Sequence, residues 1–192
     1  MSVLFVAAVQ EETAALPDNV EVVHVGVGKV AAAVGLAEVL ASRDDISLVV
    51  NVGTAGGLKH QKVGEVVEVA HVSQHDLNHA GIEALVGRPQ PGGPLTLPGP
   101  EGAAGRLVTG DRLVANGADR DRLGANAEVV DMEGYALAAV CARFGVSIWM
   151  AKAVSDSADE SAARSWHSAL TICAESLAKW AKARGLTNDS AA

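Results

Sequence analysis

The sequence is poor in cysteine, in aromatic residues and in basic charge. Its two cysteines, Cys141 and Cys173, lie in apolar runs and lack the spacing of metal ligands, so we expect buried thiols rather than a disulfide or a nucleophile. The formal net charge is −8 at pH 7, and no basic stripe is visible along the chain. Because a nucleic-acid partner requires positive charge for its phosphates, these observations argue against such a partner.

The sequence shows no long apolar run, and from its first residues we expect no leader segment. No run reaches the roughly 18 apolar residues that indicate a membrane-spanning helix. Met1 leads directly into an apolar strand, without the charged region and cleavage site of a signal peptide. We therefore predict a cytoplasmic protein without a membrane partner.

The length and the composition predict one domain with a substantial core. The chain has 192 residues, of which 49% are hydrophobic, so folding needs neither disulfides nor a metal. We predict a single domain over residues 1–185 and a polar tail over residues 186–192. We expect no cofactor and no metal site.

Short β-rich runs alternate with alanine-rich stretches of helical spacing. The predicted strands are Ser2–Ala8, Glu21–Val25, Ile46–Val52, Val63–Val72, Arg106–Thr109 and Ser147–Val154, and the predicted helices are Lys29–Ser42, Met132–Phe144 and Ala162–Arg184. We predict a glycine-rich turn at Gly53–Gly57 and an irregular loop at Gly87–Gly105. Continuous rather than alternating apolar strands indicate a sheet covered on both faces. The predicted fold class is α/β, a three-layer sandwich with a central mixed, mostly parallel sheet.

Acidic residues stand next to the predicted strands and helices at three points of the chain. Glu12 comes shortly after the first strand, Glu133 stands at the start of a helix, and Asp156 follows the last strand. Ligands of open α/β sheets bind outside the carboxyl ends of the strands, so converging ends would form one pocket rich in carboxylates. Taken singly, each acid is also typical of a helix cap or a first helical turn, where it faces the helix dipole.

Seven segments carry a resemblance to a known family. They occur in the family order between Ala7 and Glu160, and they read AAVQEETAAL, VGVGKVAAA, NVGTAGGL, VGEVVEV, VTGDRLV, VVDMEGYALAAVC and AKAVSDSADE. The chain resembles the nucleoside phosphorylase and nucleosidase superfamily, and it is most similar to the methylthioadenosine/S-adenosylhomocysteine nucleosidases. The resemblance implies a nucleoside phosphorylase-like fold and hydrolysis of the N-glycosidic bond of a purine nucleoside, such as a 5′-modified adenosine. It also implies a homodimer and a place in methionine salvage.

The resemblance also implies roles for particular residues. Glu12 is matched to the glutamate that polarises the attacking water, and Asp156 to the aspartate that handles the purine. Met132 and Glu133 are matched to residues that hold the ribose, and Ser155 to one that supports the aspartate. The residues matched to substrate binding are Thr54, Leu113, Val114, Met132, Glu133 and Ser155.

Cleavage of a glycosidic bond to a purine requires acids in two different states. The sugar becomes oxocarbenium-like, and the base must leave neutral rather than as an anion. Asp156 is therefore expected to hold a proton and to deliver it to the five-membered ring of the base. Glu12 is expected to be ionised and to accept a proton from water, and Glu133 to accept hydrogen bonds from the sugar hydroxyls.

The chain departs from the family pattern in three ways. It is shorter than the family norm, and Leu113 occupies the place of an aromatic residue that stacks on adenine. A hairpin before VGVGKV and a helix near the proline-rich loop are missing from the sequence pattern. The sequence therefore leaves the physiological base and 5′ group open.

Water is favoured over phosphate as the attacking group. Before Arg43 the only basic side chains are His24 and Lys29, and phosphate beside Glu12 would be repelled. Three alternatives stay open: a futalosine-type hydrolase of menaquinone synthesis, a purine nucleoside phosphorylase, and a catalytically inactive nucleoside-binding protein. Asp156 favours a 6-amino purine, because a carboxylate accepts a hydrogen bond from the amine.

Two further motifs suggest other functions. Residues 26–31 match the G-x-G-x-x-A pattern of dinucleotide-binding proteins, but the motif follows the second strand rather than the first, so a tight turn explains it better. His71, His75 and His79 would form a metal-binding face on a helix. Their segment reads instead as the end of a strand and a loop, which would not align them.

Two bulky side chains lie close to the predicted pocket in the sequence. Lys152 falls inside the strand that leads to Asp156, from which it could reach a carboxylate, although such a lysine more often snorkels or pairs at an edge. Trp166 belongs to the last helix, from which it could cover the pocket.

Overall fold

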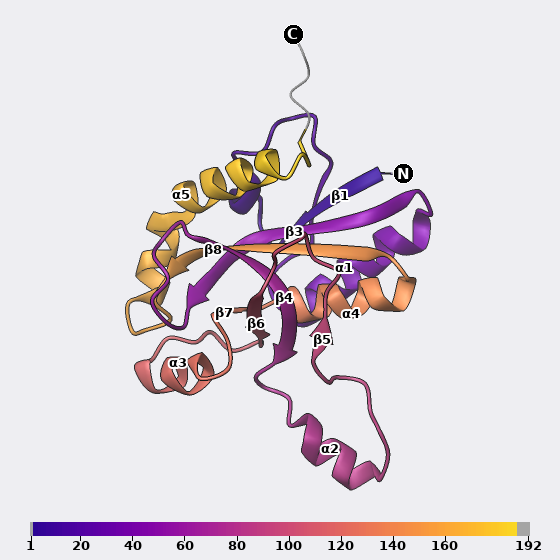
Figure 1. Ribbon diagram of the computed structural model, residues 1–192, viewed down its shortest axis with the longest axis vertical. Coiled ribbons are helices and arrows are strands. Elements are labelled where there is room, and N and C mark those ends of the chain that lie inside the picture. The colour runs from indigo at the N-terminus through magenta and orange to yellow at the C-terminus, as the bar shows by residue number, and fades with distance from the viewer. Residues whose placement is uncertain (1, 188–192) are drawn as a thin grey trace.

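The computed structural model describes residues 2–187, and their strands join into one sheet (Figure 1). The strands are β1 (Ser2–Ala7), β2 (Val22–His24), β3 (Ile46–Gly57), β4 (Val66–Gln74), β5 (Leu95–Thr96), β6 (Gly105–Thr109), β7 (Val129–Asp131) and β8 (Ser147–Asp156). The helices are the 3-10 helix η1 (Gln10–Thr13), α1 (Lys29–Ser42), α2 (His79–Val86), α3 (Gly117–Gly124), α4 (Gly134–Phe144) and α5 (Ala162–Ala183).

The sheet is mixed and mostly parallel, as the sequence predicts. Its order is β2-β1-β3-β7-β6-β4-β5, and β8 pairs with both β3 and β4. The pairs β1–β2, β1–β3, β3–β8, β4–β6 and β6–β7 are parallel, whereas β3–β7, β4–β5 and β4–β8 are antiparallel. The pairings of β3, β7, β6, β4 and β8 form a closed ring, so the carboxyl ends of several strands come together on one side.

Helices cover both faces of the central strands (Figure 1), with α1 and α4 on one face and α5 on the other. Leu4 and Val6 of β1 belong to the core shared with α1 and α4, whereas Phe5 and Ala7 belong to the core beneath α5. Successive side chains of a strand point to opposite faces, so a strand between two helix layers must be apolar on both. The predicted three-layer sandwich is confirmed.

β3 is longer than the sequence predicts. The strand continues to Gly57 and stays paired with β8 as far as Gly56, so the predicted turn at residues 53–57 is wrong. The glycines provide space rather than a turn. A Cβ atom on Gly53 would lie 3.2 Å from Oε1 of Glu12. The missing side chain therefore allows the acid to approach the backbone of the strand.

Two short helices, α2 and α3, lie where the sequence analysis predicts none. Each begins after an asparagine whose side chain accepts a hydrogen bond from a backbone N–H of the first turn, Asn78 from Gly81 and Asn116 from Asp119. These N-caps are a signal that apolar periodicity misses. Because α2 directly precedes the proline-rich loop and extends away from the sheet (Figure 1), the expectation that a helix near this loop is missing is wrong.

Other predicted bounds differ at their ends. α4 begins at Gly134, two residues later than predicted, with Glu133 as its N-cap residue. The loop at residues 87–105 is irregular apart from β5 and the first residue of β6. Of the predicted polar tail, Leu186 packs against the core beneath α5, and residues 188–192 lie outside the described residues.

The structure can be compared with two expectations from composition, one on the cysteines and one on membrane-spanning helices. Cys141 and Cys173 are buried free thiols, as predicted. Within residues 2–187, no helix combines the length and the apolar character that crossing a bilayer requires.

Candidate active site

A cavity of about 320 Å³ lies where β1, β3 and β8 end and where α4 begins. The predicted site residues all line it: Glu12, Thr54, Leu113, Val114, Met132, Glu133, Ser155 and Asp156. They come from segments that are far apart in the sequence, and the strand ends bring them to one place. Their shared cavity favours a common site over a set of unrelated helix caps.

Glu12 is buried in η1, directly after β1, and its carboxylate is held by four hydrogen bonds. Oε1 accepts from the backbone N–H of Thr54 at 2.7 Å and from its hydroxyl at 2.8 Å. Oε2 accepts from the backbone N–H groups of Ala8 at 3.1 Å and Val9 at 3.3 Å. These donors fix the orientation of the carboxyl group at the cavity.

Asp156 is buried at the end of β8, where its two oxygens have different partners. Oδ1 accepts from the backbone N–H of Ala158 at 2.8 Å, and Oδ2 lies 2.6 Å from the hydroxyl oxygen of Ser155. That hydroxyl is also 3.3 Å from the carbonyl oxygen of Ala55. The Ser155 hydroxyl and the Ala158 N–H together fix the orientation of the Asp156 carboxyl group.

Glu133 is the buried N-cap residue of α4, and its Oε1 accepts from the backbone N–H of Gly28 at 2.8 Å. Burial and the neighbouring carboxylate of Asp131 raise the pKa of Glu133 to about 7, while Lys152 and the Gly28 N–H oppose this rise. Glu133 can therefore exchange a proton near neutral pH.

Lys152 and Asp131 form a buried ion pair behind the cavity, with Nζ 2.8 Å from Oδ2. Lys152 therefore reaches a carboxylate, one of the two outcomes that the sequence left open, and it does not snorkel or pair at an edge, because its side chain is only 2% exposed. Asp131 also accepts from the hydroxyl of Thr109 at 2.6 Å and from the N–H of Gly134 at 2.9 Å. Burial alone would lower the pKa of Lys152, but Asp131 and Glu133 outweigh it and raise that pKa, so the lysine stays charged.

The glycine motif at residues 26–31 contributes to this site. Gly28 has φ +94, in the region that favours glycine, and a Cβ atom there would lie 3.2 Å from a carboxylate oxygen of Asp111. The turn delivers the backbone N–H of Gly28 to Glu133 at the start of α1. The glycines thus form a tight turn, as the sequence analysis expects, and this turn also holds an acid.

One side of the cavity is formed by the loop after β6. Arg112, Leu113 and Val114 line the cavity here, and we call these three residues the loop wall. Val114 is buried, but Leu113 is 56% exposed. The guanidinium of Arg112 lies 3.5 Å from Asp119, and the Arg112 side chain is 79% exposed.

The histidines that suggested a metal site lie on separate elements. His71 is in β4, His75 follows that strand, and His79 begins α2. Within residues 2–187, no group of three or more potential metal ligands is suitably placed. His75 and Asp76 line a smaller cavity of about 130 Å³ on the other side of the loop wall.

The sequence analysis missed Asp131, and it left open whether Lys152 reaches a carboxylate. The available signal was a lysine inside a continuous apolar run together with an acid two residues before Glu133. Buried charges are almost always paired, so the two could have been matched. Trp166 lines the cavity from α5, in keeping with the suggestion that it covers the pocket.

The sequence and the fold together define the class of protein. Residues 16–184 match the phosphorylase superfamily. The chain therefore belongs to this superfamily, as its sequence motifs predict.

Individual relatives can be compared with this chain in sequence and in fold. The chain is 30% identical to a 5′-methylthioadenosine/S-adenosylhomocysteine nucleosidase of Actinobacillus succinogenes, over 82% of this chain and 76% of the relative. A structure of the nucleosidase of the same name from Neisseria meningitidis, in complex with methylthio-immucillin-A, has a similar fold, with a TM-score of 0.77. The two sequences are 28% identical, and the comparison covers 94% of this chain and 98% of that one. The futalosine hydrolase of Helicobacter pylori shares the fold, with a TM-score of 0.80 and 22% identity over 94% of this chain and 95% of that one.

Proposed function

We propose that this protein hydrolyses the N-glycosidic bond of a purine nucleoside, and that its substrate is a 5′-modified adenosine such as methylthioadenosine or S-adenosylhomocysteine. One observation carries the proposal: Glu12, Glu133 and Asp156 line a single cavity, and each is held there by backbone N–H groups. The names of the curated relatives support the choice of substrate.

Glu12 is proposed to activate the attacking water. Its carboxylate is held at the cavity by four hydrogen bonds, so its position relative to the attacking water is fixed. The water oxygen forms a bond to C1′ of the sugar while the bond from C1′ to N9 of the base breaks. One proton of the water passes to Glu12, and the electron pair of the broken bond passes to the purine.

Asp156 is proposed to protonate the departing base at N7. The Ser155 hydroxyl donates a hydrogen bond to Oδ2 of Asp156 at 2.6 Å, which fixes this side chain at the cavity. The neutral purine then leaves as a much better leaving group than its anion. Glu133 is proposed to accept hydrogen bonds from the ribose hydroxyls, with Met132 against the sugar face.

Water is proposed as the nucleophile because the basic side chains near the cavity already have carboxylate partners. Arg112, which lines the cavity, lies 3.5 Å from Asp119, and Lys152 behind the cavity is paired with Asp131 at 2.8 Å. A phosphate ion would have to displace these partners and approach Glu12 against charge repulsion. A phosphorylase would instead present free cationic groups to its phosphate.

We also propose a homodimer that acts in the cytoplasm, in methionine salvage. Val27, Val30 and Val34 are exposed by 56%, 74% and 62% along α1 and the turn before it, and Val27 also lines the cavity. An apolar stripe at helical spacing next to a site is a suitable contact for a second copy. Sedimentation of the wild-type protein and of a Val30→Glu variant tests this: the wild type is expected as a dimer and the variant as a monomer.

The function is tested by measuring base release from a panel of nucleosides, with and without phosphate. The panel contains methylthioadenosine, S-adenosylhomocysteine, adenosine, inosine and futalosine. We expect release of adenine from methylthioadenosine at a rate that does not depend on phosphate. Strict dependence on phosphate would indicate a phosphorylase, and preference for futalosine would indicate the alternative hydrolase. No release from any purine nucleoside would favour a binding protein without catalytic activity.

A further inference from the structure

Trp166 contacts the catalytic part of the cavity through a polar atom. It lies in the first turns of α5, half-buried, and its side chain lines the cavity. Its indole N–H donates a hydrogen bond to the hydroxyl oxygen of Thr54 at 2.9 Å. This bond joins α5 to the carboxyl-terminal half of β3. The two bonded residues are 112 positions apart in the chain.

Thr54 in turn forms hydrogen bonds with Glu12. The Thr54 hydroxyl oxygen lies 2.8 Å from Oε1 of Glu12, and the Thr54 backbone N–H donates to the same oxygen at 2.7 Å. An indole N–H can only donate, and a threonine hydroxyl has a single hydrogen. Thr54 must therefore accept from Trp166 and donate to Glu12, which fixes the direction of the whole chain of hydrogen bonds.

We propose that Trp166 is a positioning residue for Glu12, acting through the hydroxyl of Thr54. This inference rests on the proposed function, in which Glu12 activates the attacking water. A free hydroxyl rotates, and it can turn its hydrogen away from Glu12 toward a neighbouring water. The indole N–H occupies one acceptor site of that hydroxyl and leaves its hydrogen directed at Oε1. The carboxylate is thereby held in one orientation before the substrate reacts.

A packing role alone would not require tryptophan at this position. Among the residues that line the cavity within the described part of the chain, Trp166 is the single aromatic side chain. A phenylalanine would supply a similar apolar ring, but it has no N–H group for Thr54. The polar end of the ring therefore separates the positioning role from simple coverage of the pocket.

A double-mutant cycle on Trp166 and Thr54 tests the proposal. Trp166→Phe keeps a ring and removes the N–H, and Thr54→Val removes the hydroxyl. Since one neutral hydrogen bond is lost, we expect Trp166→Phe to lower kcat about fivefold, with KM for methylthioadenosine nearly unchanged. In the Thr54→Val background the same substitution should cause no further loss, because the link is already broken. An equal loss of kcat in both backgrounds would overturn the proposal.

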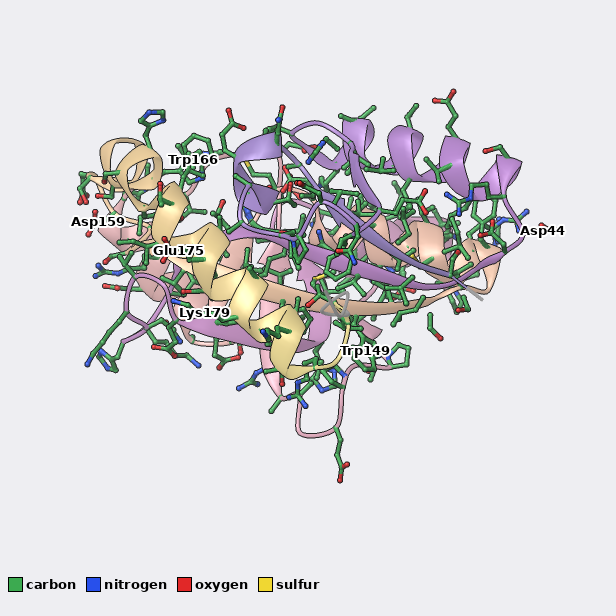
Figure 2. All side chains as sticks on the ribbon, turned by 90° about the horizontal axis from the view of Figure 1, so that it is seen from above. Asp44, Trp149, Asp159, Trp166, Glu175 and Lys179 are labelled. Carbon is green, nitrogen blue, oxygen red and sulfur yellow. The ribbon has the colours of Figure 1, made fainter. Side chains whose placement is uncertain are left out.

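Trp149 offers a matched control, since it carries the same side chain in β8, away from the cavity. Figure 2 shows Trp166 near the start of α5 and Trp149 apart from it, near the opposite end of that helix in this view. Trp149→Phe is expected to leave kcat unchanged. Melting temperatures of the variants establish that each is folded.

A spectroscopic measurement tests the hydrogen bond independently of activity. In protein labelled with ¹⁵N at the indole nitrogens, the Trp166 signal is assigned by its loss in Trp166→Phe. Thr54→Val should shift that signal upfield, whereas the Trp149 signal should stay in place. An unchanged Trp166 signal would contradict the proposed link. A wild-type protein that releases no base would refute the proposed function instead, even where the expected shift is seen.

Discussion

The two sides of the cavity are built differently. Glu12, Glu133 and Asp156, which we call the acid wall, stand at the ends of strands or at the start of a helix, and each is buried and held by backbone N–H groups. The loop wall follows β6, and its Leu113 is 56% exposed. The acid wall is thus preorganised for chemistry. The loop wall is more open, and a bound substrate or a second copy of the chain can cover its exposed part.

The largest expected effect comes from the acid wall itself. Asp156→Asn is expected to lower kcat about a thousandfold, because the amide has no proton to give to the departing base. Its side-chain oxygen can still accept from the N–H of Ala158, so the melting temperature should stay close to that of the wild type. Steady-state kinetics and thermal unfolding check both parts. Turnover near the wild-type rate would remove Asp156 as the acid.

Removing one partner of the ion pair behind the acid wall should destabilise the protein more than removing one partner of a surface ion pair. Lys152→Met would leave Asp131 buried without its partner, so the free energy of unfolding should fall by about 3 kcal/mol or more. Lys59→Met, which removes a partly exposed contact with Glu128, should cost at most about 1 kcal/mol. Urea titrations of the two variants measure the difference. Equal losses would show that the buried pair is no more important than a surface pair.

Glu133 should make the stability depend on pH. Its pKa is raised from 4.5 to about 7, so the folded protein binds this proton more tightly than the unfolded chain does. The free energy of unfolding should therefore fall by about 2 kcal/mol from this group as pH rises from about 5 to about 8. Glu133→Gln removes the titrating group, so the variant should gain that amount relative to the wild type over the same range. A difference that does not vary with pH would contradict this explanation.

The smallest effect is expected on the loop wall. Leu113→Phe should lower KM for methylthioadenosine about fivefold, because an aromatic ring stacks on the purine more favourably than leucine does, by about 1 kcal/mol. The value of kcat should change little, since no acid is touched. Leu85→Phe, on the exposed surface of α2, serves as the control. If KM does not respond to Leu113→Phe, the base does not lie against this wall.

The same contrast explains what the sequence could predict. Glu12 and Asp156 are visible because each comes at or just after an apolar strand, and the carboxyl ends of parallel strands meet. The layers follow from the continuous apolar strands, whose two faces need cover. These features depend on local pattern together with a general rule of sheet topology.

Other parts of the site depend on partners that the pattern does not specify. A lysine in an apolar strand becomes a buried ion only because Asp131, from a different strand, lies 2.8 Å away. The bond from Trp166 to Thr54 likewise depends on how α5 lies over the end of β3. The extension of β3 through Gly53–Gly57 went unrecognised because glycine more often signals a turn than a close approach.

Hydrolysis in water enriched in ¹⁸O tests the central claim most directly, which is that Glu12, Glu133 and Asp156 act on one sugar with water as the nucleophile. After adenine is released from methylthioadenosine, mass spectrometry of the sugar product should detect one ¹⁸O atom at C1′. Glu12→Gln should slow its appearance strongly while leaving the melting temperature near that of the wild type. A sugar 1-phosphate without the label, or an undiminished rate in the Glu12→Gln variant, would contradict the account.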